Sequence, residues 1–376
     1  MIPTEMFGEE LKKYGFDFYS GVPCSFLKPL INYAINECEY VTAVNEGEAV
    51  AISAGASIGG RRPIVLMQNS GLTNASSPLT SLIQPFKIPI LGFVSLRGEP
   101  GLSDEPQHEI MGEITGDMLT LMKIEWDYLS SDLEVACEQL HKALRVLEGN
   151  QPYFFIVTKG TFGSVTLLNQ RDKQSINKRK IVKTNEDQLP SRIDALKVIN
   201  SQKDAHTIQL ATTGKTGREL FEIEDSHHNL YMVGSMGCIS SLGLGLSLVR
   251  RDKKIVTIDG DGAFLMRMGC LATNGFQNPS NLLHILLDNQ THDSTGGQAT
   301  VSHNVDFVSI AASCGYENSI YVHNLVELAQ FIQDWKKQPQ LTFLYLRITK
   351  GSMKGVGRPK LKPYEVKERM QVFLND

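Results

Sequence analysis

We predict an α/β protein built from two doubly wound parallel-sheet domains. Short apolar runs alternate with longer amphipathic segments along both halves of the 376-residue chain, a pattern typical of βαβ units. Between residues 166 and 190 the alternation stops, and the chain becomes polar and basic. We therefore expect a first domain over 1–165, a linker over 166–190 and a second domain over 191–376.

Each half contains five runs with the length and the β-branched or aromatic content of strands. In the first half these runs are 16–20, 40–44, 63–68, 89–96 and 153–157. In the second half they are 206–211, 229–233, 253–259, 281–288 and 341–348. Helical patterns lie between them, among them 25–36, 47–59, 77–86 and 263–276. Strands that alternate with helices in this way indicate parallel sheets.

The composition narrows the possible function classes. Hydrophobic residues make up 41% of the chain, charged residues 21%, and the net charge is −4. This balance lacks the basic footprint of nucleic-acid-binding proteins, so we interpret the basic segment 166–190 as an exposed linker rather than a nucleic-acid-binding arm. No run approaches the about 18 apolar residues of a membrane span, and the N-terminus lacks the pattern of a signal peptide. The six cysteines form no CxxC pair, so we expect a reduced, cytoplasmic protein without a zinc ribbon or a disulfide framework.

The chemistry-bearing residues gather where predicted strands end. The run 253–259 leads into Gly260, Asp261 and Gly262, and Ala263 begins the helical pattern that follows. A strand, a glycine turn and a helix N-terminus together form a cradle for phosphate groups. The next strand ends at Asn289, which adjacent strands would place beside Asp261. Because their side chains offer hard oxygen ligands, we expect Mg²⁺ and a diphosphate here. A capped βα turn without a ligand is the alternative.

This pair of strand ends resembles the motif of thiamine diphosphate enzymes, a Gly-Asp-Gly turn followed by Asn-Asn. The resemblance implies that Asp261, Asn289 and the carbonyl of Thr291 bind Mg²⁺ together with the diphosphate. The sequence departs from the motif at Asp288, which stands where the family has its first Asn. The second Asn, which is the metal ligand, is kept.

The first half carries a segment that resembles the other signature of these enzymes. In NEGEAVAISAG, Glu46 and Gly55 have the family spacing, whereas Glu48 does not. The resemblance implies that Glu46 hydrogen-bonds the aminopyrimidine ring, whose imino form takes the proton from thiazolium C2. The carbanion chemistry would then belong to the cofactor. The alternative is an acid placed at a helix start by the helix dipole.

Two further segments fit a cofactor site. MVGSMGCISS resembles the family segment in which a bulky residue, here Met236 after Ser235, wedges the cofactor into its bent form. A core methionine is the alternative. ATTGKTGREL is not a P-loop, because Gln209 stands where that motif needs glycine. We interpret Thr213 and Gly214 instead as a turn that touches the diphosphate, with Lys215 as an additional cation.

The whole chain resembles the phosphonopyruvate decarboxylase family, with the sulfopyruvate decarboxylases as close relatives. The resemblance is carried by SGVPCSFLKPLINY, QNSGL, RGEPGLSDEPQH, GDGAFLMRMG and GSMKGVGRP. It implies a pyrimidine-binding and a diphosphate-binding domain without a middle domain, and the loss of CO₂ from phosphonopyruvate. The alternatives are a sulfopyruvate decarboxylase, a carboligase of the acetolactate synthase type and a non-catalytic nucleotide-binding module.

Decarboxylation leaves a carbanion that needs a positioned acid. His108 and His292 are the candidates for proton transfer, and Ser25 stands where relatives place a polar residue over the substrate.

The substrate implied is a small 2-oxoacid with an anionic tail, which calls for fixed cations. Arg97, Arg267 and Arg358 are the candidates for binding this tail. The resemblance also implies a homo-oligomer with its active sites at subunit interfaces.

Overall fold

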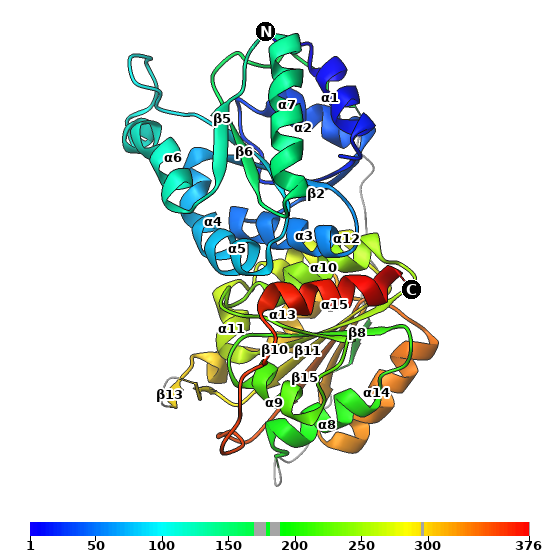
Figure 1. The fold of residues 1–376 in the computed structure, drawn as a ribbon. Coiled ribbons are helices and arrows are strands. Elements are labelled where there is room, and N and C mark those ends of the chain that lie inside the picture. The colour runs from blue at the N-terminus through cyan, green and yellow to red at the C-terminus, as the bar shows by residue number, and fades with distance from the viewer. Residues whose placement is uncertain (169–177, 181–188, 295–296, 376) are drawn as a thin grey trace. The chain divides into compact units, whose positions relative to one another are not determined.

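The structure is a computed structural model that describes residues 1–168, 178–180, 189–294 and 297–375. It divides into two compact units, Met1–Asp172 and Lys173–Asp376. The division falls within the segment 166–190, of which 169–177 and 181–188 lie outside the described residues. Both units are α/β folds around a parallel sheet, as Figure 1 shows. The predicted fold class is therefore confirmed.

The sheet of the first unit has six parallel strands in the order β2-β1-β3-β4-β6-β5. The strands are β1 (Phe18–Gly21), β2 (Glu39–Thr42), β3 (Pro63–Gln68), β4 (Leu91–Ser95), β5 (Glu125–Tyr128) and β6 (Tyr153–Val157). Five of them fall within or beside the predicted runs. The sixth, β5, lies at the sheet edge and carries the charged residues Glu125 and Asp127, which an apolar pattern does not detect.

Helices cover the sheet of this unit. They are α1 (Thr4–Lys13), α2 (Lys28–Glu37), α3 (Glu46–Ile58), α4 (Leu72–Pro78), α5 (Gln84–Phe86), α6 (Glu109–Leu121) and α7 (Leu133–Glu148), with a π-helical turn at Leu79–Ile83 and 3₁₀ turns at Asn69–Gly71 and Pro106–His108. Helices α1, α2 and α7 share one apolar core with the sheet, in which Phe93 packs against Phe7 and Phe155. Helix α3 is buried along nearly its whole length and packs on β1 and β3 (Figure 1).

The sheet of the second unit has seven strands, all parallel, in the order β7-β14-β15-β11-β10-β8-β9. They are β7 (Lys178–Lys180), β8 (Thr207–Ala211), β9 (Asn229–Tyr231), β10 (Lys254–Gly260), β11 (Leu282–Asp288), β14 (Asn318–Val322) and β15 (Thr342–Arg347). A small antiparallel pair, β12 (Thr291–His292) and β13 (Gln298–Ala299), follows β11. Strand β7 comes from the segment 166–190, and β14 was not predicted.

The helices of this unit are α8 (Arg192–Ser201), α9 (Lys215–Ile223), α10 (Ile239–Val249), α11 (Asp261–Met266), α12 (Cys270–Gln277), α13 (Phe307–Ser313), α14 (Leu325–Lys337) and α15 (Pro363–Asn375), with a 3₁₀ turn at Ser302–Asn304. The pattern 263–276 was predicted as one helix and forms two, α11 and α12. The break lies between Arg267, whose non-helical backbone ends α11, and Gly269, the residue directly before α12. No helix of the described residues is long and apolar enough to cross a membrane.

Candidate functional site

The central feature of the second unit is a cavity at the ends of β10 and β11. These strands pair in parallel with Gly260 opposite Leu287, so Asp261 and Asn289 follow neighbouring strand ends. Both side chains are buried, with exposed fractions of 2% and 4%. Predicted site residues that line the same cavity are Thr213, Gly214, Lys215, Met236, Gly260, Asp261, Gly262, Ala263, Asn289, Thr291 and His292. The structure thus gathers residues from several parts of the sequence around one hollow.

Asp261 is a buried carboxylate with a hydroxyl as its partner. Thr300 donates a hydrogen bond to Asp261, and Ser302 donates one to Asp288 at 3.0 Å. Burial raises the pKa of Asp261; the hydrogen bond from Thr300 opposes this shift, and the charge of Asp288 adds to it. Within the described residues, Asp261 makes no ion pair. A buried carboxylate near a second one is stabilised most effectively by a cation, so the site fits a bound metal ion.

Asp288, the residue that departs from the family motif, already has its own cation. Its side chain is fully buried, accepts a hydrogen bond from the Tyr345 hydroxyl at 2.7 Å and lies 3.3 Å from the Arg347 guanidinium. Arg347 stands opposite Asp288 on the neighbouring strand β15. An acid is tolerated in place of the first Asn because this neighbouring strand supplies the compensating charge.

Asn289 is oriented by a residue that the sequence analysis missed. Its side-chain nitrogen donates to Asp293 Oδ2 at 2.6 Å, and its Oδ1 accepts from the backbone N–H of Thr291 at 3.2 Å. Asp293 also accepts a hydrogen bond from Arg192 at 2.5 Å. Although burial opposes ionisation, the bonds from Arg192 and Thr291 lower the pKa of Asp293. Asp293 thus uses its charge to fix the amide of Asn289.

The sequence analysis also missed Arg192, because no local motif around it indicates a binding site. It is the first residue of α8, is 6% exposed and lines the same cavity. Its guanidinium lies between Asp293 and Glu219, which is 3.5 Å away. Asp293, by contrast, lies in the segment DNQTHDS beside the predicted metal ligands, and this proximity is the signal that could have found it.

Two turns with left-handed backbone shape the cavity. Gly214 has φ +92° directly before α9, and Ser235 has φ +42° in the turn that also contains Met236. A Cβ on Gly237 would lie 2.8 Å from the carbonyl of Ala263 and 3.2 Å from Arg267, so this turn packs closely on α11. Such close approaches require glycine. Met236 is half-buried at the cavity wall.

In the first unit, two acids at the start of α3 have different surroundings. Glu48 is buried, and its carboxylate accepts the backbone N–H of Val44 at 2.7 Å. Glu46 is half-buried and accepts a hydrogen bond from Asn74 at 2.8 Å. Glu48 therefore stabilises the helix start, whereas Glu46 is held by a side chain from α4. Asn74 was missed by the sequence analysis.

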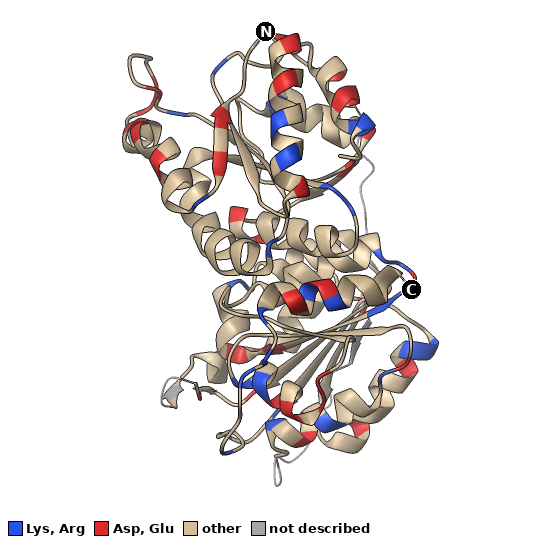
Figure 2. Cartoon of the chain, viewed as in Figure 1, with Lys and Arg blue, Asp and Glu red and all other residues tan. Residues whose placement is uncertain are grey.

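Arg97 and Ser25 lie together in the first unit. Arg97 donates to Ser25 Oγ at 3.4 Å and makes a two-pronged ion pair with Asp104, one prong of which is 2.7 Å long. The hydrogen bond from Arg97 holds the pKa of Asp104 well below its usual range. Asp104 belongs to the loop before α6, in which the acidic positions are red in Figure 2.

His108 directly precedes α6 and is 9% exposed. Its Nδ1 has no hydrogen-bond partner among the described residues. A Cβ on Gly98 would meet the carbonyl of His108 at 2.1 Å, so the loop after β4 lies directly on the start of this helix. The close packing fixes the position of His108 within its unit.

Groups of three or more His, Cys, Asp or Glu side chains suited to a metal ion do not occur within 1–168, 178–180, 189–294 and 297–375. A metal ion bound at Asp261 would therefore depend on amide and carbonyl oxygens, together with oxygens of a ligand. Hard cations such as Mg²⁺ accept this kind of ligand set.

The contact between Gly71 and Glu46 gives a testable prediction. A Cβ on Gly71 would lie 2.3 Å from Glu46 Cγ, so Gly71→Ala should displace the Glu46 side chain and lower the free energy of unfolding by about 1–3 kcal/mol, as overpacking does. In a Glu46→Ala background the same substitution should cost much less. A double-mutant cycle by denaturant unfolding measures the difference, and equal costs in the two backgrounds would contradict the contact.

Comparisons with known proteins place the chain in a family. Residues 4–118 match the N-terminal TPP binding domain of thiamine pyrophosphate enzymes, and residues 212–346 match the C-terminal TPP binding domain. A phosphonopyruvate decarboxylase from Streptomyces viridochromogenes is 38% identical over 96% of this chain and 92% of its own length. A sulfopyruvate decarboxylase from Methanosarcina acetivorans is 28% identical over 99% of this chain and 98% of its own.

The fold is also that of a known enzyme. The crystal structure of benzoylformate decarboxylase from Polynucleobacter necessarius matches 94% of this chain and 100% of its own with a TM-score of 0.73, at 14% identity. This likeness concerns the fold alone, whereas the sequence relatives cover nearly the whole chain at higher identity. The chain therefore belongs to the thiamine diphosphate-dependent enzymes and, among them, to the phosphonopyruvate decarboxylase family.

Proposed function

We propose that this protein catalyses the non-oxidative decarboxylation of 3-phosphonopyruvate to phosphonoacetaldehyde and CO₂, with thiamine diphosphate and Mg²⁺. The observation that carries the proposal is the similarity to a phosphonopyruvate decarboxylase over 96% of the chain. The reaction would be a step in the biosynthesis of phosphonates of the 2-aminoethylphosphonate type. A sulfopyruvate decarboxylase is the second candidate, because a relative of that name spans 99% of the chain.

We propose residues 191–376 as the diphosphate-binding domain and 1–165 as the pyrimidine-binding domain, joined by 166–190. In the former, Asp261, Asn289 and the carbonyl of Thr291 would hold Mg²⁺. The desolvated carboxylate of Asp261 supports this role, since a cation would offset its burial. The turns at Thr213-Gly214, Ser235-Met236 and Gly260-Asp261-Gly262-Ala263 would hold the cofactor.

Glu46 would hydrogen-bond the pyrimidine ring and favour its imino form, which would take the proton from thiazolium C2. Its half-exposed carboxylate, held by Asn74, supports this role over Glu48, whose carboxylate is used within the helix start. When bound, thiamine diphosphate supplies an electron sink for the electron pair that stays behind when CO₂ departs. The protein binds and orients the substrate, excludes water and delivers a proton.

Three polar residues would act at the reacting carbon. His292 lines the cavity with Asp261, and its ring lies against Gly262, where a Cβ would be 2.5 Å from Cε1. His292 and His108 are the proton-transfer candidates. Ser25, within reach of Arg97, would contact the substrate.

The anionic tail of the substrate needs a cation, for which Arg97, Arg267 and Arg358 are the candidates. Asp104 already neutralises Arg97 through two contacts. Arg267 packs beside Gly237. Arg358 lines a separate cavity of the second unit, which makes it the preferred candidate of the three.

We further propose a cytoplasmic homo-oligomer with its active sites at subunit interfaces. Glu46 and Asp261 belong to separate compact units, and one cofactor must contact both. All six cysteines are free thiols, which supports a reducing compartment.

The proposed reaction is tested with purified protein, thiamine diphosphate, Mg²⁺ and a panel of phosphonopyruvate, sulfopyruvate and pyruvate. Release of CO₂ and of aldehyde is measured for each, and kcat/KM is expected to be highest for phosphonopyruvate. A preference for sulfopyruvate would establish the second candidate. A ligated acid in place of an aldehyde would indicate a carboligase.

Glu46→Gln should leave cofactor binding intact and slow proton exchange at C2 of the bound cofactor by ~10²–10⁴, as the loss of a general acid–base group does. Glu48→Gln is the matched control and should exchange at the wild-type rate, because its amide oxygen can still accept the N–H of Val44. Deuterium exchange followed by NMR measures both. A wild-type exchange rate in Glu46→Gln would refute the role of Glu46.

Asp261→Ala should abolish the Mg²⁺ dependence of cofactor binding, because it removes the charged ligand of the metal. Binding is measured by calorimetry with and without Mg²⁺. Asp252→Ala removes an exposed acid of the same unit, paired only with Arg250 in the contacts described, and should bind like the wild type. Undiminished Mg²⁺-dependent binding by Asp261→Ala would place the metal elsewhere.

Mixing the inactive Glu46→Gln and Asp261→Ala proteins by co-expression should restore part of the activity. If each site combines two subunits, a mixed oligomer contains one site with both native residues. Each variant expressed alone is the control. Mixed oligomers that mass spectrometry detects but that remain inactive would show that each site is built from a single subunit.

A further inference from the structure

A second cavity of about 400 Å³ lies in the second unit, beside the one that contains Asp261. Its walls come from the start of α9, the end of β9, the segment before α15 and the first turn of α15. Thr213 and Gly214 line both cavities. A molecule in the second cavity would therefore lie next to the turn proposed to hold the cofactor diphosphate.

This second cavity is lined by two arginines and by no acid. Arg218 comes from α9 and Arg358 from the segment before α15, and the lining residues include no Asp or Glu. Neither arginine makes an ion pair within the part of the protein that the structure describes. Glu222, one helical turn after Arg218, does not line the cavity and accepts the backbone N–H of Gly357 at 2.9 Å.

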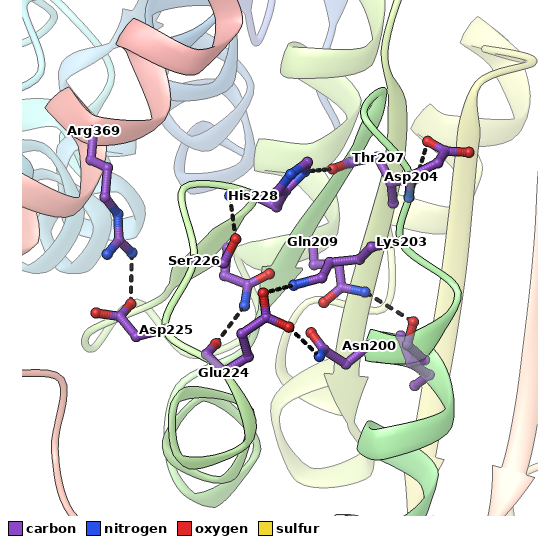
Figure 3. Close-up of polar contacts among 12 residues, drawn as sticks. Asn200, Lys203, Asp204, Thr207, Gln209, Glu224, Asp225, Ser226, His228 and Arg369 are labelled. Carbon is purple, nitrogen blue, oxygen red and sulfur yellow. Dashed lines mark hydrogen bonds and ion pairs between the residues drawn. The ribbon is translucent and has the colours of Figure 1, made fainter.

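Some other basic residues of the second unit have a carboxylate partner. Arg369 on α15 donates to Asp225 at 2.7 Å, and Lys203 lies 3.1 Å from Glu224, as Figure 3 shows. Two guanidinium groups without a carboxylate partner at one cavity create a positive potential. Guanidinium groups are suited to two-pronged contacts with the oxygens of phosphonate, phosphate or sulfonate.

The segment that carries Arg358 is held in place by carboxylates. The backbone N–H groups of Gly351, Met353 and Gly357 donate to Asp293 at 3.3 Å, Glu219 at 2.9 Å and Glu222 at 2.9 Å. These bonds fix the backbone ahead of Arg358.

Beyond Arg358, α15 is fixed by the bond from Arg369 to Asp225, and Lys253 lies 4.5 Å from the ring centre of Phe373. Although the Arg358 side chain is exposed, its backbone lies between two anchored stretches. The backbone from which Arg358 projects is thus set in advance, which lowers the entropic cost of binding an anion.

Arg218 is positioned by the close packing of α9. A Cβ on Gly217 would lie 3.0 Å from the carbonyl of Thr212 and 3.7 Å from Tyr231 Cβ, so the start of α9 packs tightly on the backbone that follows β8 and lies in contact with β9. The rest of the wall is largely apolar, with Val233, Leu361 and Val366 among its residues. Apolar walls strengthen the attraction between the arginines and an anion.

We propose that this cavity binds the phosphonate tail of the substrate through Arg218 and Arg358. The proposal rests on the function proposed above and assigns Arg218, which no sequence pattern indicated, to substrate specificity. A phosphonate carries between one and two negative charges at neutral pH, which two arginines match. A sulfonate carries one, and pyruvate has no tail to bind.

Arg218→Gln and Arg358→Gln test the assignment, with Arg251→Gln as the control. Arg251 is exposed in the same unit and does not line the cavity. The first readout is calorimetric binding of methylphosphonate to the protein without cofactor. Each cavity variant should bind it about 10- to 100-fold more weakly, the range expected for the loss of one charge-assisted hydrogen-bonding group. The control should bind like the wild type.

The second readout is catalysis. Each cavity variant should lower kcat/KM for phosphonopyruvate by a similar factor, chiefly through KM, and leave the turnover of pyruvate nearly unchanged. Arg218→Lys should recover part of the loss, because it keeps the charge but not the two-pronged geometry. In the wild type, methylphosphonate should inhibit phosphonopyruvate competitively.

The outcomes separate this proposal from the proposed function. Both cavity variants could turn over phosphonopyruvate at the wild-type rate and with undiminished affinity. That result would overturn the tail site and leave the proposed function intact. Non-competitive inhibition by methylphosphonate would also overturn it, since the anion would then bind away from the substrate. Arginine-dependent binding in a protein that does not turn over phosphonopyruvate would support the anion site and refute the function.

Discussion

Two carboxylates, Asp261 and Asp288, are buried at neighbouring strand ends. The groups around them must therefore supply hydrogen bonds and positive charge. Thr300 donates a hydrogen bond to Asp261, and the hydroxyls of Ser302 and Tyr345 donate to Asp288. Only Asp288 also has an ion pair among the described residues, with Arg347. The charge of Asp261 is therefore the one that the proposed metal ion would offset, whereas Arg347 already offsets the charge of Asp288.

A second acid, Asp293, connects this centre to the rest of its unit. It orients the amide of Asn289, accepts the hydroxyl of Thr291 at 2.9 Å and binds Arg192. It also accepts the backbone N–H of Gly351, at the start of the segment that carries Arg358. The proposed metal ligands and the proposed tail site thus share a carboxylate, so the segment that follows β15 is attached to the same group that fixes Asn289.

The first unit separates two acids in a comparable way. The carboxylate of Glu48 accepts a backbone N–H at the start of α3, whereas Glu46 accepts a side-chain hydrogen bond from Asn74. Gly71 allows the 3₁₀ turn after β3 to approach Glu46, since any larger side chain would overlap it. In both units, a neighbouring element gives two nearby acids different partners.

The sequence by itself determined the two α/β units, most of their strands and the Gly260-Asp261-Gly262 turn, because hydrophobic periodicity and glycine turns are local. It did not reveal β5 and β14, whose strands carry polar residues and are only partly buried. The tertiary structure alone decided that Arg347 neutralises Asp288, that Arg192 binds Asp293 and that Arg218 shares a cavity with Arg358. These pairs join residues distant in the sequence, and they depend on strand register and helix packing. No local pattern encodes either, because both follow from how the whole sheet buries its apolar surface.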